Sequence, residues 1–152
     1  MLLNYFLAVL VLAFSFAGTV FMSGGALSGY LDIPSILIMV FFPFVYQCLL
    51  FGVSTVKTAF TAGFKKDAAM EQLTKAQLFF KSYSKVIWIT ALAVVLIGMI
   101  AILKYLEDRT ALGPNFALAF LSLLYGGMLH LVIIIPNSVF LKKRLIELNM
   151  DI

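Results

Sequence analysis

Charged residues are scarce in this sequence: Asp, Glu, Lys and Arg make up 12% of its 152 residues, whereas 63% are hydrophobic. Soluble domains carry roughly a quarter charged residues, so this composition excludes a soluble globular domain and indicates a membrane protein. With one cysteine and one histidine, the chain also excludes a disulfide framework and a metal cluster of these residues. We therefore expect no metal and no cofactor.

Carboxylates are missing from the parts of the chain that are apolar enough to enter a bilayer. Four segments are long enough to cross its hydrocarbon layer of about 30 Å, namely residues 2–22, 33–53, 86–103 and 116–135. None of them contains Asp or Glu, and no phosphate-binding loop or Ser/His/Asp set occurs. The sequence predicts a single membrane domain over residues 1–152, with an all-α fold. It argues against an enzyme and against a carboxylate-based proton carrier acting alone.

The basic residues predict how the chain lies in the membrane. Two of them, Lys104 and Arg109, lie in the short loops of one side. Nine lie on the other side: Lys57, Lys65, Lys66, Lys75, Lys81, Lys85, Lys142, Lys143 and Arg144. Because basic residues collect on the cytoplasmic side, we expect cytoplasmic termini, a cytoplasmic hairpin over residues 54–85 and a cytoplasmic tail over residues 140–152. This distribution accounts for the net charge of +4 without nucleic acid.

Capping residues and prolines predict where the spans begin. Asp32 stands before Ile33-Pro34, which is typical of a helix N-cap followed by a proline in the first turn. Gly113-Pro114 is expected to start the fourth span in the same manner. Pro43 is expected to kink the second span.

The second and third spans are expected to extend into the cytoplasm as long helices. The second is predicted to run to about Gly63 and to be followed by a turn over residues 63–66. A further helix, capped by Asp67, is predicted to merge into the third span and to reach about 55 Å. Glu71 and Lys75 are spaced to form an ion pair on its surface.

One side of the fourth span is small and polar. Its members recur every three, four or seven residues and therefore share one side of a helix. They are Asn115, Ala119, Ser122, Gly126, His130 and Asn137. Small residues let membrane helices approach closely, which leaves two interpretations open: contact with a partner or pore, or packing inside the monomer. His130 likewise either titrates near neutral pH or stays neutral and hydrogen-bonded to a neighbour.

Two stretches carry recognisable motifs. The first is Tyr30-Leu31-Asp32-Ile33-Pro34-Ser35. The second runs without gaps through Leu103, Leu106, Asp108, Leu112, Gly113, Pro114, Ala117, Ala119, Ser122, Tyr125, Gly126 and Pro136. Together they resemble the A-subunit of the bacterial flagellar stator, the MotA-type branch of the MotA/TolQ/ExbB family. Gly98 matches the second glycine of that family's third-span motif.

The resemblance implies a homo-oligomeric ring, a pentamer, in the bacterial inner membrane. The third and fourth spans would line the ring, and two copies of a single-span MotB/ExbD/TolR-like partner would carry the ion-binding aspartate. Such a complex moves H⁺ or Na⁺ and turns as ions pass. Residues predicted to face the partner or the ion path are Asn115, Ala119, Ser122, Tyr125, Gly126, His130 and Gly98.

Some positions depart from the family pattern and motivate an alternative. Val95 stands where the family has a threonine in the third span, and Ser122-Leu123 replaces a double threonine in the fourth. The hairpin over residues 54–85 stands in place of a larger cytoplasmic domain. The alternative function is a non-conducting structural or regulatory scaffold of an envelope complex.

Overall fold

The computed structural model describes residues 2–65, 68–104, 106 and 109–150. Every regular element within these ranges is helical. Four of the helical stretches are long and apolar enough to cross a membrane: Leu3–Met22, Ile33–Phe51, Met70–Lys104 and Leu112–Asn149. The prediction of an all-α fold with four helices long and apolar enough to cross a membrane is confirmed for the described residues.

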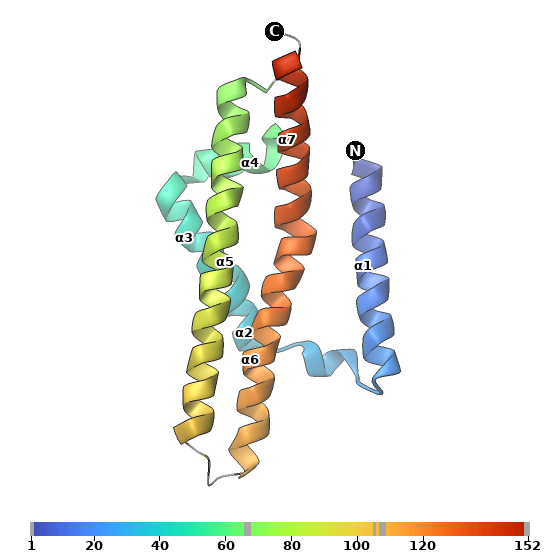
Figure 1. The fold of residues 1–152 in the computed structure, drawn as a ribbon, viewed down its shortest axis with the longest axis vertical. Helices are drawn as coiled ribbons and strands as arrows, with labels where there is room; N and C mark the ends of the chain where they lie inside the picture. The colour runs from blue at the N-terminus through green and yellow to red at the C-terminus, as the bar shows by residue number, and fades with distance from the viewer. Residues whose placement is uncertain (1, 66–67, 105, 107–108, 151–152) are drawn as a thin grey trace.

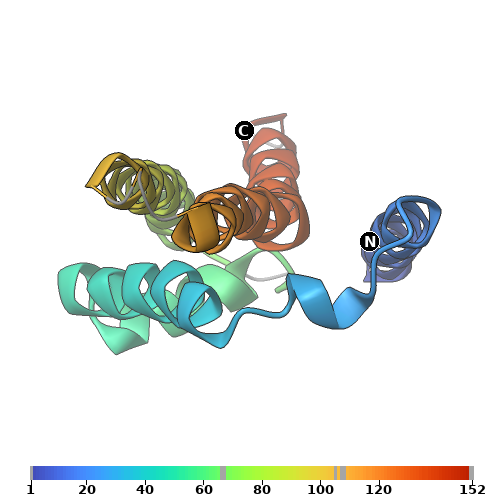
Figure 2. The ribbon, with the colours of Figure 1, turned by 90° about the horizontal axis from the view of Figure 1, so that it is seen from below.

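Two long helices lie side by side and form the centre of the fold. They are α5 (Met70–Lys104) and α6 (Arg109–Leu129), and α6 continues through a π-helical turn, η3 (His130–Ile134), into α7 (Ile135–Met150). A second layer covers one side of this pair (Figures 1 and 2). It consists of α2 (Ile33–Ile36), the π-helical turn η2 (Leu37–Phe41), α3 (Phe42–Phe51) and α4 (Val53–Ala62). No described element covers the opposite side of α5 and α6 (Figure 2).

The first helix, α1 (Leu2–Met22), stands beside the two layers (Figure 1). A short 3-10 helix, η1 (Leu27–Tyr30), connects it to α2. The Tyr5 hydroxyl donates to the Val132 carbonyl oxygen at 3.0 Å. That oxygen lies four residues before Pro136, which has no N–H to offer it, so α1 occupies an acceptor that the proline leaves free.

Aromatic rings hold the second layer against α5. Phe79 meets both Phe51 of α3 and Phe60 of α4 edge-on, with ring centroids 5.5 Å and 5.8 Å away. Phe60 also meets Phe80, at 5.2 Å. Since Phe79 and Phe80 are fully buried, these contacts are the centre of the core at this end of the molecule.

The helix of the second span is broken, which corrects the prediction that this helix runs without interruption to about Gly63. It ends at Phe51 and restarts at Val53. Gly52 between them has φ +77° and ψ 146°, a conformation that is essentially restricted to glycine. The chain turns there, and α4 crosses behind α5 instead of extending α3 (Figure 1).

The four prolines occupy three kinds of position in the helices. The Asp32 side chain accepts from the Ser35 N–H at 2.9 Å, so the predicted cap before Pro34 is present. Gly113-Pro114 does not start a helix as predicted, because α6 begins at Arg109 and contains Pro114. Pro43 and Pro136 each follow a π-helical turn, which widens the helix where a proline ring would collide with the preceding turn.

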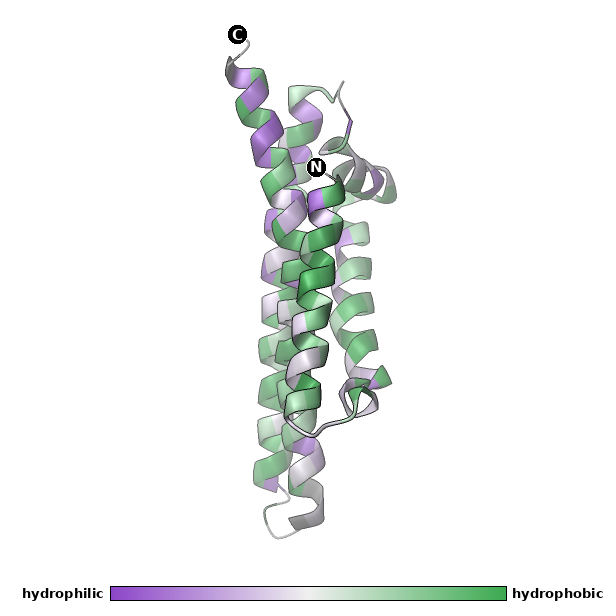
Figure 3. Ribbon diagram, turned by 90° about the vertical axis from the view of Figure 1, so that its right-hand side faces the viewer, coloured by the Kyte–Doolittle hydropathy of each residue, from purple (hydrophilic) through white to green (hydrophobic). Residues whose placement is uncertain are grey.

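The third membrane helix extends beyond its apolar segment. α5 has 35 residues, which correspond to about 52 Å. The predicted Glu71–Lys75 ion pair is formed at 2.6 Å near its start. The predicted cap Asp67 and the motif residue Asp108 lie outside the described residues. Hydrophilic residues gather toward the end of the molecule where α7 stops, and hydrophobic ones line the middle of the helices (Figure 3).

Candidate functional site

The small, polar stripe of the fourth span packs inside the monomer. A Cβ atom added to Gly98 of α5 would lie 3.1 Å from the Ala119 Cβ and 3.3 Å from the Asn115 carbonyl oxygen. The two helix backbones therefore approach here as closely as a glycine allows. Of the two interpretations left open by the sequence, helix packing describes what Asn115, Ala119 and Gly98 do in this chain.

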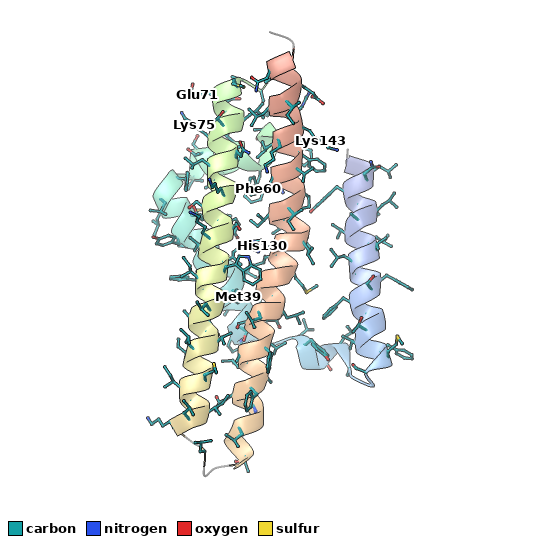
Figure 4. The ribbon with its side chains drawn as sticks, viewed as in Figure 1. Met39, Phe60, Glu71, Lys75, His130 and Lys143 are labelled. Atoms are coloured by element: carbon teal, nitrogen blue, oxygen red, sulfur yellow. The ribbon has the colours of Figure 1, made fainter. Side chains whose placement is uncertain are left out.

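Gly126 extends the same contact toward the second layer. A Cβ atom at this position would lie 3.3 Å from the Met39 Cε, 3.5 Å from the Ala91 Cβ and 3.6 Å from the Ile87 Cγ2. Met39 is fully buried at this three-way junction of η2, α5 and α6 (Figure 4). The next residue, Gly127, has no atom within 4 Å of its Cβ position. Of these two neighbouring glycines, only Gly126 lies at a close approach between elements.

Ser122 is turned into the same interface. Its side chain is 0% exposed, and its hydroxyl donates to the Ala119 carbonyl oxygen of its own helix at 2.7 Å. The prediction that Ser122 faces a partner or an ion path stays a prediction; in this single chain its side chain is buried inside the monomer. Its hydroxyl cannot reach a partner helix unless the subunit rearranges.

Tyr125 links the fourth span to the start of the second. Its hydroxyl donates to the Tyr30 carbonyl oxygen and accepts from the Asp32 N–H at 3.0 Å. Asp32 thus caps α2 with its side chain and anchors it to α6 through its backbone. Tyr125 and Asp32 fix where the second layer begins, which is a structural role.

His130 lies at the edge of the α5–α6 interface (Figure 4). Its Nδ1 lies 3.0 Å from the Gly126 carbonyl oxygen and its Nε2 lies 2.8 Å from the Ser84 Oγ. Because a carbonyl oxygen only accepts, Nδ1 carries a hydrogen, and a neutral ring then accepts the Ser84 hydroxyl hydrogen at Nε2. The Trp88 ring lies 5.0 Å away and is 45% exposed. His130 thus contacts α5 through both Ser84 and Trp88.

The uncovered side of α5 and α6 is apolar, and we call it the open face. We assign to it the exposed side chains Trp88, Leu92 and Met99 of α5 and Phe116 and Phe120 of α6. These side chains are between 45% and 65% exposed and recur every four or seven residues along each helix. The site prediction missed this face because it followed the polar stripe. The helical spacing of large apolar residues in both segments was the sequence signal that could have predicted this face.

Comparison with known proteins gives two relatives. The chain is 32% identical to the "Chemotaxis protein PomA" of Vibrio alginolyticus over 85 residues, which are 55% of this chain and 34% of that protein. It is 34% identical to the "Motility protein A" of Borreliella burgdorferi over 77 residues, which are 51% of this chain and 30% of that protein. The matched region thus spans about a third of each relative. No protein-family profile matches the chain.

These findings bear on the predicted class of protein. Both relatives are named for motility or chemotaxis rather than for a catalysed reaction. Together with the four apolar helices, they support the predicted multi-pass protein of the bacterial inner membrane. Over about half of its length, the chain is related to the MotA-type proteins of the flagellar motor.

Proposed function

We propose that this chain is a MotA-type ring subunit of an ion-driven membrane motor. In this proposal five copies surround two copies of a single-span, MotB-like partner, and both termini are cytoplasmic. The observation that supports it most is the similarity to two motility proteins over half of the chain. The Lys-rich hairpin and tail would mark the cytoplasmic side.

The open face is the surface that would receive the partner. It belongs to the third and fourth spans, which the family resemblance assigns to the inside of the ring. Its large apolar side chains suit close packing against an apolar helix, and an aromatic residue such as Phe120 is the usual kind of anchor at an interface. The apolar segments of residues 86–103 and 116–135 contain no carboxylate, so the ion-binding Asp would come from the partner.

An ion path along this face would be H⁺-selective or Na⁺-selective and would use few polar groups of this chain. Ser122 is withdrawn into the monomer. His130 and Ser84 are hydrogen-bonded to each other near the end of the open face that Trp88 occupies. A hydrated ion would therefore depend on the partner and on water for most of its ligands.

A second candidate is a non-conducting scaffold that holds partner helices in an envelope complex. It is favoured by Leu123, which stands at a position where the resemblance expects a hydroxyl. Val95 replaces the corresponding threonine in the third span. A face without hydroxyl groups can bind helices as well as a face that has them, but it raises the free energy of an ion beside it.

The test begins with the protein purified in mild detergent from the membranes of its own host. Native mass spectrometry should give five copies of this chain with two copies of a single-span protein. Phe120→Ala should weaken retention of that protein about tenfold, because it removes an aromatic contact from the open face. Phe14→Ala is the matched control, since Phe14 is 79% exposed and belongs to α1 and not to α5 or α6.

Flux measurements then separate the two functions. The purified complex is placed in liposomes that contain a pH-sensitive or a Na⁺-sensitive dye, and an ion gradient is applied. Flux that disappears when the partner's Asp is replaced supports the motor subunit. A complex of the expected composition without flux supports the scaffold. A chain that stays monomeric and retains no single-span protein refutes both.

A further inference from the structure

A groove between α5 and α7 lies where the apolar segments give way to the Lys-rich end of the molecule. It has a volume of about 640 Å³. Three basic residues line it, Lys81 and Lys85 from α5 and Lys142 from α7. The groove is therefore built by two elements that are distant in sequence but adjacent in the fold.

The lysines of this groove have no counter-charge among the described residues. Among the described residues, ion pairs join Lys75 to Glu71 and Arg144 to Glu147. None of these four residues lines the groove. Three like charges around one cavity repel one another unless an anion lies between them. The groove therefore has the electrostatic character of an anion site.

Neutral hydrogen-bonding groups add to this character. Ser84, Ser138, Thr74 and Gln77 also line the groove. Hydroxyl and amide groups beside lysines are suitable partners for phosphate oxygens. Ser84 already contacts His130, so one wall of the groove is fixed to the end of the α5–α6 interface.

The position of the groove indicates the source of the phosphate. Lys85 directly precedes the apolar segment of residues 86–103, and Ile134 lies at the end of the segment of residues 116–135. The groove thus begins at the level where hydrocarbon gives way to lipid headgroups. Leu78, Phe80 and Ile134 supply an apolar wall beside the lysines.

We propose that this groove binds the phosphate headgroup of an anionic phospholipid. An acidic protein segment is the less suitable occupant, because single-span partners carry basic residues just inside the membrane and three lysines would repel them. Basic pockets between membrane helices on the positive side are known to suit anionic headgroups. The groove is formed by residues of one chain, so binding of the headgroup needs no second copy.

The test compares two triple variants of the full chain that lose the same charge. The groove variant carries Lys81→Gln, Lys85→Gln and Lys142→Gln. The control variant carries Lys57→Gln, Lys65→Gln and Lys143→Gln, which lie outside the groove. Lys143 extends from α7 on the side away from α5 (Figure 4). Circular dichroism and gel filtration check that both variants fold.

Native mass spectrometry then measures retention of phosphatidylglycerol, with phosphatidylcholine as the neutral lipid. The wild-type and control proteins should retain phosphatidylglycerol preferentially, and the groove variant should bind it about tenfold more weakly or less. Equal losses in the two variants would overturn the proposal, because they would report general surface charge. So would equally tight binding of glycerol phosphate, which indicates a soluble phosphate ligand, or binding of a Glu-rich peptide in place of the lipid.

Discussion

Replacing Gly98 by alanine tests the close approach of α5 and α6. The new Cβ would lie 3.1 Å from the Ala119 Cβ and 3.3 Å from the Asn115 carbonyl oxygen. Carbon atoms prefer separations of about 3.5–4.0 Å, so α5 and α6 must move apart by several tenths of an ångström. Both obstructing atoms belong to or adjoin the α6 backbone, and a rotamer change cannot relieve the contact. Overpacking of this kind destabilises a core by about 1–3 kcal/mol.

Gly127→Ala is the matched control for this substitution. A Cβ atom there meets nothing within 4 Å, yet the change brings the same gain in helix propensity, up to about 1 kcal/mol. The difference between the two variants in the free energy of unfolding therefore isolates the close approach. We expect Gly98→Ala to be less stable than Gly127→Ala by about 1–3 kcal/mol.

The assay is reversible unfolding in mixed micelles with a rising fraction of denaturing detergent. Trp88 is the single tryptophan of the chain and lies beside His130 at the α5–α6 interface, so its fluorescence reports separation of these helices. Circular dichroism follows helix content in the same samples. Equal stability of the two alanine variants would show that α5 and α6 do not meet at Gly98, and the inward orientation of the stripe would then be wrong.

Three further substitutions follow from the same geometry. Ser122→Ala should change the free energy of unfolding by less than about 1 kcal/mol, since it removes one hydrogen bond within a helix, and ion flux should persist; a tenfold loss of flux would contradict this. Tyr125→Phe should destabilise the fold by about 1–3 kcal/mol in the same unfolding assay, because the Asp32 N–H loses its acceptor inside the protein. Gly52→Ala should cost about 1–3 kcal/mol or straighten the chain between α3 and α4, which spin-label distances across the bend would detect.

Composition and local pattern carry much of this fold. Runs of apolar residues predict the four membrane helices, because a bilayer requires both their length and their lack of charge. The Asp32 cap and the Glu71–Lys75 pair are also predictable, since each depends on residues within one turn of the other. Interactions between residues so close in sequence can be predicted from their spacing alone.

Other features depend on neighbours that the order of residues does not reveal. Gly52 looks like any glycine in a helix, and only packing of α4 across α5 makes it a bend. The stripe around Ser122 has the same spacing whether it faces a partner or α5. The lysine groove requires α5 and α7 to be adjacent, although Lys85 and Lys142 lie far apart in the sequence. Function was therefore easier to place through family resemblance than through any one polar residue.

The unbroken length of α5 has a mechanical consequence. A rigid rod of about 52 Å that tilts by about 5° at one end displaces its other end by about 4–5 Å. The second layer is interrupted at Gly52, and α4 is packed on α5 through Phe60. A small rocking of α5 within the bilayer would therefore carry along both α3 and α4, because Phe79 packs on each of them. A small tilt of α5 inside the bilayer would therefore produce a larger displacement at its end outside the bilayer.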